Sequence, residues 1–141
     1  MKNRDIVGAI IVNEKNEILL QKKTFDYKFS PGGCWTFFGG EIKGDESPEQ
    51  TLKREIKEEI NYDIKNFYLF KAGRYKFPSG GLKGKKYIFV VFFDGDISQI
   101  SLREGGGFGF FSTSELNYIK IQNLILRDLK EYINTNFKKK R

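Results

Sequence analysis

The chain has 141 residues and a formal net charge of +7, and 39% of its residues are hydrophobic and 16% aromatic. This length is typical of one domain with a single core, and the aromatic content excludes an intrinsically disordered chain. The lone cysteine, Cys34, excludes an internal disulfide, and the absence of histidine removes any ordinary zinc site.

Runs rich in aliphatic, β-branched or aromatic residues predict strands, because each is bounded by turn-forming residues. They cover residues 6–12, 18–21, 35–38, 66–71, 86–94 and 108–111. The turn sequence Asn13–Asn16 predicts a hairpin between the first two strands. No apolar run approaches the roughly 20 residues that span a bilayer. The first run lacks a small-residue cleavage site, so we interpret it as a strand rather than a signal peptide and expect a cytoplasmic protein.

Two segments predict helices. Ser47 is a capping residue followed by Pro48 at the first helical position and Gln50 three residues after the cap, which predicts a helix from Pro48 to about Ile60. Asn61 tolerates the left-handed conformation that ends many helices. Near the C-terminus, apolar residues at helical spacing predict a second helix that packs on the sheet. These are Ile121, Leu124, Ile125, Leu129, Tyr132 and Ile133.

Two predicted loops border the strands. Thr24–Gly33 is expected to be a loop with the capacity to lie over a site. The loop Lys71–Lys86 is rich in Lys and Arg, which either meet phosphates or, as we favour, keep the surface soluble. Aromatic residues in or near these loops are candidates for stacking on a base, although we assign none: Phe25, Tyr27, Phe29 and Tyr75. Three others are expected in the core: Trp35, Phe37 and Phe38.

An acidic cluster lies on the first predicted helix. Glu55, Glu58 and Glu59 fall within one arc of roughly 100°, beside the apolar stripe of Leu52, Ile56 and Ile60. Like charges at this spacing destabilise a helix by a few tenths of a kcal/mol per pair, and a bound cation would relieve that repulsion. All-oxygen ligands suit Mg²⁺ or Mn²⁺, whose other positions hold water and substrate phosphates. The alternative is a solvated face paired with Lys53, Arg54 and Lys57.

The segment Gly40–Tyr62 resembles the Nudix box, Gly-x5-Glu-x7-Arg-Glu-U-x-Glu-Glu-x-Gly-U, in which U is apolar. The residues that stand at the required offsets are Gly40, Glu46, Arg54, Glu55, Ile56, Glu58 and Glu59. Asn61 replaces the usual glycine, and Tyr62 stands where an aliphatic residue is commoner. Because Asn also tolerates the left-handed turn, neither change touches the expected metal site.

The resemblance implies a single Nudix hydrolase domain over residues 1–141, folded as an α/β/α sandwich with a central mixed β-sheet. It implies a pyrophosphohydrolase that uses Mg²⁺ or Mn²⁺ to cleave a diphosphate linkage of a nucleoside triphosphate or another nucleoside diphosphate derivative. By resemblance, Glu55, Glu58 and Glu59 bind metal with the main-chain carbonyl of Gly39. Glu46 would position the metal or its waters, and Arg54 would orient the glutamates.

A general base is still required, and without histidine a glutamate must serve. Glu55 is one candidate. Glu104 is the other, because a glutamate shortly before an aromatic strand completes the metal site in several family members. The surrounding glycines would let this loop close over substrate. The alternative for Glu104 is a plain surface turn.

The positive net charge favours acidic partners, both small phosphorylated molecules and nucleic acid. Part of the charge lies in the tail Lys138–Arg141, which we expect to be frayed. An RNA 5′-end pyrophosphohydrolase is therefore an alternative, although no long basic stripe is interleaved with aromatics. A non-catalytic, Nudix-like nucleotide-binding module is another, which the retention of every box carboxylate disfavours. The particular nucleotide, the number of metal ions and the oligomeric state stay open.

Overall fold

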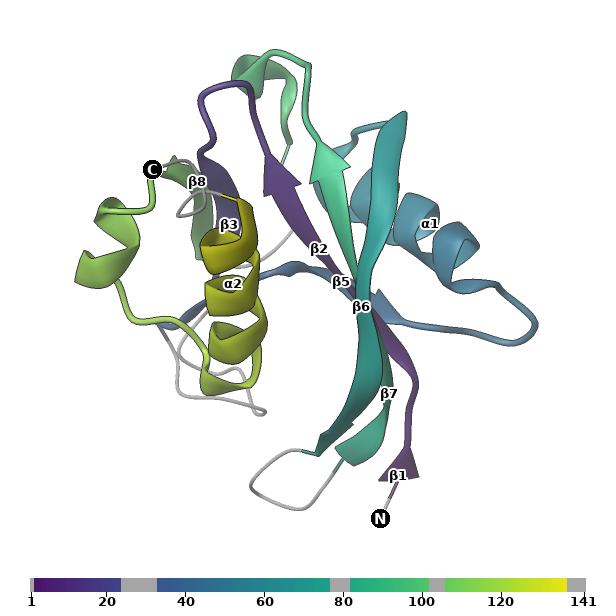
Figure 1. Ribbon diagram of the computed structural model, residues 1–141. Coiled ribbons are helices and arrows are strands. Elements are labelled where there is room, and N and C mark those ends of the chain that lie inside the picture. The colour runs from purple at the N-terminus through teal and green to yellow at the C-terminus, as the bar shows by residue number, and fades with distance from the viewer. Residues whose placement is uncertain (1, 24–32, 77–81, 102–105, 137–141) are drawn as a thin grey trace.

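The computed structural model describes residues 2–23, 33–76, 82–101 and 106–136. In this part of the chain, eight strands form one mixed sheet, with helix α1 (Pro48–Ile60) on one face and helix α2 (Asn123–Asn136) on the other (Figure 1). The strands are β1 (Lys2–Asn3), β2 (Ile6–Val12), β3 (Ile18–Lys22), β4 (Trp35–Thr36), β5 (Phe38–Glu41), β6 (Asn66–Lys76), β7 (Leu82–Phe92) and β8 (Gly107–Phe111). Two 3-10 helices are η1 (Ile97–Gln99) and η2 (Glu115–Tyr118). The predicted α/β/α sandwich is confirmed.

Strand β2 is central to the sheet. It pairs in parallel with β7 along its whole length, from Ile6 opposite Lys86 to Val12 opposite Phe92. Its other edge is shared by two antiparallel strands, because β5 pairs with the first half and β3 with the last two residues. Strand β3 in turn carries β4 and β8. The short strand β5 therefore lies beside the middle of the sheet and next to α1.

Alternation of side chains along the strands divides the core into two layers. The layer under α1 contains Val7, Ala9, Ile11, Leu19, Phe38, Leu52, Ile56, Ile60, Phe89, Val91 and Phe93. The layer under α2 contains Ile10, Val12, Ile18, Leu20, Phe37, Ile88, Val90, Leu116, Ile125, Leu129 and Tyr132. Burial of each large aliphatic side chain contributes about 1.5–3 kcal/mol. These layers fix both helices on the sheet.

Local signals set the ends of α1 as predicted. Ser47 Oγ accepts a hydrogen bond from the Gln50 amide at 3.1 Å, and Gln50 Oε1 accepts one from the Ser47 amide at 2.9 Å. This reciprocal pair is a capping box. Asn61 ends the helix with φ 56°, the left-handed conformation that its side chain tolerates. The acidic cluster is therefore held on a well-defined helix.

Two predictions about the strands are wrong. Lys71–Lys86 is not a loop, because β6 continues to Lys76 and β7 begins at Leu82, so the two strands extend as a hairpin. Charged residues alternate along the exposed part of this hairpin, so the sequence there lacks the apolar run that predicts a strand. Residues 35–38 are not one strand, because the chain changes partner from β3 to β2 between β4 and β5. Gly39 and Gly40 consequently lie inside β5 rather than after it.

The aromatic predictions have mixed outcomes. Phe37 and Phe38 are buried as expected, and the partly buried Trp35 packs edge-on against Phe111 with ring centroids 4.8 Å apart. Tyr75 lies buried in β6 and not in a loop, and its hydroxyl donates to the Arg4 carbonyl at 2.6 Å. The other stacking candidates and the tail lie outside the described residues: Phe25, Tyr27, Phe29 and Lys138–Arg141.

Neither α1 nor α2 combines the length and apolar character needed to cross a membrane, and no other described helix does.

Candidate active site

Arg54 on α1 contacts three of the predicted carboxylates. Its guanidinium forms a bidentate pair with Glu46, at 2.7 Å from Nε and 2.9 Å from Nη2. Nη1 donates to Glu55 at 2.9 Å and to Glu58 at 3.0 Å, while Nη2 also reaches a main-chain carbonyl of β5 at 3.1 Å. Hydrogen bonding to Arg54 lowers the pKa of Glu46 to about 2. Arg54 therefore contacts three of the glutamates that it is predicted to orient.

Glu59 points away from Arg54 and toward β5. Its carboxylate accepts the Gly39 amide at 2.9 Å and Gln21 Nε2 at 3.2 Å. Burial raises the pKa of Glu59 to about 7, and the nearby charge of Glu55 acts in the same direction. Burial also raises the pKa of Glu55. Burial and a neighbouring carboxylate thus oppose the ionisation of Glu59, and a bound cation would favour its charged form.

Gln21 was missed in the sequence, where it stands as the last residue of an aliphatic run. It is only 3% exposed, and Nε2 donates to the Phe37 carbonyl at 3.1 Å as well as to Glu59. A buried glutamine in a strand needs hydrogen-bond partners for its amide. A polar residue at the end of an aliphatic run is the sequence signal that could have pointed to Gln21. Gln21 therefore ties β3 to α1 across β5.

Two glycines of β5 allow close approach of the strand to its neighbours. Gly39 has φ +151°, and an added Cβ would collide with the Val7 carbonyl. At Gly40 an added Cβ would overlap the Glu55 carboxylate. The backbone of β5 thus approaches the acidic face of α1 as closely as glycine allows.

The donor set fits a hard divalent cation, because it consists only of carboxylates and a main-chain carbonyl. Among the described residues, however, no three acidic side chains converge closely enough to hold a cation as they stand. Arg54 explains this arrangement, since it holds Glu55 and Glu58 to itself. The Glu58 side chain is 54% exposed and has space to turn from Arg54 to a cation. Glu104 lies outside the described residues.

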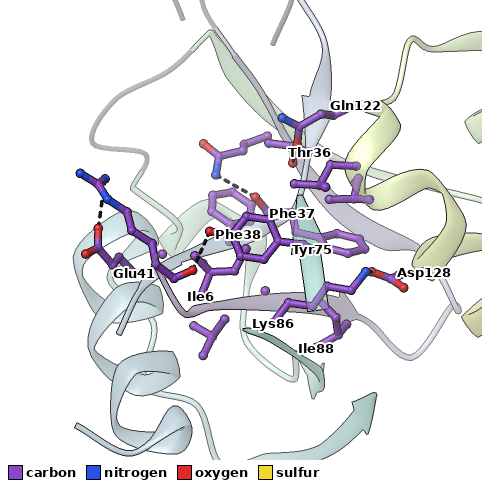
Figure 2. A pocket seen from close by; sticks show the side chains of 18 of the residues that line it. Ile6, Thr36, Phe37, Phe38, Glu41, Tyr75, Lys86, Ile88, Gln122 and Asp128 are labelled. Carbon is purple, nitrogen blue, oxygen red and sulfur yellow. Dashed lines mark hydrogen bonds and ion pairs between the residues drawn. The ribbon is translucent and has the colours of Figure 1, made fainter. Parts of the chain in front are cut away.

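A pocket of about 250 Å³ opens on the other side of β5, between the sheet and α2 (Figure 2). Its apolar walls come mainly from Ile6, Phe37, Tyr75, Ile88, Leu124 and Ile125. Polar and charged groups on its lining include Gln21, Lys23, Thr36, Lys86, Gln122 and Asp128. Gly39 and Gly40 also line it. The same two glycines therefore border an apolar pocket on one side and the α1 carboxylates on the other.

The family model for the NUDIX domain matches residues 2–132. The chain belongs to the NUDIX family. The NUDIX fold is shared with a solved MutT structure, described for Aliivibrio salmonicida and Vibrio cholerae. That structure is 30% identical over 95% of this chain and 99% of its own, with a TM-score of 0.75.

Curated NUDIX relatives include the 8-oxo-dGTP diphosphatase of Escherichia coli, 37% identical over 78 residues, and the RNA pyrophosphohydrolase of a Marinomonas species, 38% identical over 60 residues. These matches cover 55% and 43% of this chain. They span 59% of the first relative's length and 34% of the second's. Substrate and activity therefore require their own argument.

Proposed function

We propose that the chain is a divalent-metal-dependent pyrophosphohydrolase that cleaves a diphosphate linkage of a nucleoside triphosphate or another nucleoside diphosphate derivative. The observation that carries this proposal is the position of Gly39 and Gly40 between the pocket and the α1 carboxylates. A base held in the pocket would direct its phosphates across these glycines toward the acidic face. The pocket is smaller than the roughly 300–1,000 Å³ of drug-sized ligand sites, which suits the base and part of the sugar.

The residues proposed to hold Mg²⁺ or Mn²⁺ are Glu55, Glu58, Glu59 and the main-chain carbonyl of Gly39, with Glu46 acting through water. Such a metal, when bound, neutralises phosphate charge and lowers the pKa of a coordinated water. Arg54 would position Glu46 and Glu55 by its contacts, whereas Glu58 would turn from Arg54 to the metal. Glu55 is one candidate for the proton acceptor. Glu104 remains the second candidate for this role.

Metal removal tests this proposal. A panel of nucleoside triphosphates and nucleotide sugars is expected to be hydrolysed with Mg²⁺ or Mn²⁺, fastest at alkaline pH, because water and a glutamate must supply the nucleophile and base. Triphosphates should yield the monophosphate and pyrophosphate. Excess chelator should abolish turnover, and added metal should restore it. Full activity in chelator would overturn the proposal, while tight nucleotide binding without any turnover would favour the non-catalytic module.

A specific observation favours RNA 5′ ends as a second candidate substrate. On the hairpin of β6 and β7, Arg74 lies opposite Lys85 and Lys76 lies opposite Lys83. All four residues are exposed, and alternation places them on one face. None has an anionic partner within the described part of the chain, and like charges opposite each other destabilise a sheet. A groove of about 410 Å³ lies beside them, and Tyr75 lines both this groove and the pocket.

Charge reversal on this face tests the second candidate. If RNA is a substrate, the double variant Lys76→Glu and Lys83→Glu should lower turnover of 5′-triphosphate RNA by about tenfold or more and reduce its salt dependence. Free nucleotides should be unaffected. The double variant Lys65→Glu and Lys130→Glu changes the net charge equally at exposed positions elsewhere and serves as the control. Equal effects of both variants on RNA would remove the hairpin from consideration.

A further inference from the structure

A buried carboxylate joins α2 to the sheet at the edge of the pocket. Asp128 on α2 is 1% exposed, and its Oδ2 accepts Lys86 Nζ at 2.6 Å, while Oδ1 accepts Lys71 Nζ at 3.1 Å. Lys71 also pairs with Glu131 at 2.9 Å. Lys86 and Asp128 line the pocket, as Figure 2 shows, whereas Lys71 is not among the lining residues.

Lys86 and Gln122 bring hydrogen-bond donors to this end of the pocket. Both Asp128 oxygens already accept a lysine, whereas the Lys86 ammonium has three donors and uses one of them on Asp128. On the same α2 side, Gln122 Oε1 accepts the Thr36 hydroxyl at 2.8 Å, which leaves the Gln122 amide group as a donor. A ligand that enters between the sheet and α2 therefore meets the remaining donors of Lys86 and the amide group of Gln122 at this end of the pocket.

Docking of α2 does not explain why Lys86 is needed. Lys71 already pairs with Asp128 and with Glu131, so one cation from the sheet holds this helix. The Lys86 side chain is only 12% exposed, and burial of a second ammonium in a pocket wall costs free energy that one shared carboxylate offsets in part. A ligand acceptor would satisfy its remaining donors.

We infer that Lys86 is a specificity-determining residue that selects nucleobases with a carbonyl oxygen on the edge entering the pocket. Uracil, thymine and hypoxanthine-type or guanine-type bases present such an oxygen, whereas cytosine and adenine present an exocyclic amine. An amine facing the ammonium would leave donors on both sides unpaired and buried, which is costly. The inference rests on the proposed function, because it requires a nucleobase in the pocket.

Two matched substrate pairs test the inference, since UTP and CTP, and likewise ITP and ATP, differ by a carbonyl-for-amine exchange and by the proton on the adjacent ring nitrogen. Wild-type protein should show kcat/KM about tenfold or more higher for the carbonyl member of each pair. Lys86→Met keeps the length of the side chain but removes its donors, and should bring both ratios close to one. Lys71→Met removes the other cation from Asp128 without touching the pocket, and should keep the wild-type ratios. Lys86→Arg keeps the positive charge and the donors, and should retain the preference for the carbonyl member of each pair.

Binding measurements make the same comparison between carbonyl and amine bases without depending on catalysis. Dissociation constants for UMP against CMP, and for IMP against AMP, should show the same preference and the same loss in Lys86→Met. A protein that hydrolyses nothing yet keeps this pattern would contradict the proposed function and support the role of Lys86. No carbonyl preference in the wild type, or a preference that survives Lys86→Met or is lost equally in Lys71→Met, would overturn the inference. Thermal unfolding of each variant confirms its fold, and if Lys86→Met does not fold, the wild-type preference and Lys86→Arg decide.

Discussion

Replacement of Glu59 by glutamine is expected to lower turnover by about a hundredfold or more, the scale seen when one charge-stabilising group is removed from an active site. Glutamine keeps the shape of the side chain, and its carbonyl oxygen can still accept the Gly39 amide. It cannot serve as a hard anionic ligand for a divalent metal. Steady-state kinetics with saturating Mg²⁺ or Mn²⁺ measure the loss.

The same variant should be at least as stable as the wild type when metal is absent. Because burial raises the pKa of Glu59 from 4.5 to about 7, the charged carboxylate opposes folding, and its stability contribution falls as pH rises through this window. Glutamine removes that dependence. In excess chelator, the unfolding temperature of Glu59→Gln should therefore exceed that of the wild type at pH 8, and the difference should narrow at pH 5.

Substitutions of other glutamates show which of them contribute to turnover. Glu58→Gln should reduce turnover as strongly, although this side chain is exposed and pairs only with Arg54 among the described residues. Glu49→Gln lies on the same helix, is exposed and should have no effect. A loss in Glu104→Gln would add that residue to the site, and full activity would leave it a surface residue. Unchanged turnover in both Glu58→Gln and Glu59→Gln would remove the proposed metal site.

Replacement of Gly40 by alanine is the second change with a large expected effect. The new Cβ would occupy the place of the Glu55 carboxylate, which must then leave β5. Because a carboxylate at the end of a flexible side chain can move, the stability cost should be modest, at about 1 kcal/mol. Turnover should fall by about tenfold or more, since even a small misplacement of an active-site group is costly.

Alanine variants of two further glycines serve as controls for this prediction. Gly39→Ala directs its Cβ into the Val7 carbonyl at a φ that alanine rarely adopts, so it should destabilise the fold by more, about 1–3 kcal/mol. Gly73→Ala lies in β6 with no atom within 4 Å of the added Cβ, and should change neither property. Denaturant unfolding and kinetics on the three variants separate the effects. If Gly40→Ala kept full turnover, the contact between β5 and Glu55 would be unimportant for catalysis.

Local signals in the sequence were sufficient to predict the ends of α1 and the positions of its charged residues. Ser47, Pro48 and Asn61 act within a few residues of the helix ends, and the Arg54–Glu58 pair follows from i, i+4 spacing. These features depend on neighbours that are close in the chain. The sandwich was predicted through the resemblance of Gly40–Tyr62 to the Nudix box.

Features that depend on distant neighbours escaped prediction. The bond from Gln21 to Glu59 and that from Lys86 to Asp128 join residues 38 and 42 positions apart, which no local pattern specifies. The break between β4 and β5 reflects a change of strand partner, which the hydrophobic run at 35–38 conceals. Charged residues on the exposed hairpin similarly hid the extension of β6 and β7. The tertiary fold, not the motif, thus creates the pocket and its polar lining.

The most direct test of the proposed metal site is a titration of the metal-free protein with Mn²⁺, followed by electron paramagnetic resonance, in the wild type and in Glu58→Gln with Glu59→Gln. We expect saturable binding by the wild type and a dissociation constant raised about tenfold or more in the double variant, because two anionic ligands are lost. Glu49→Gln should bind as the wild type does. Equal Mn²⁺ affinity in the wild type and the double variant would contradict a metal site on the acidic face of α1.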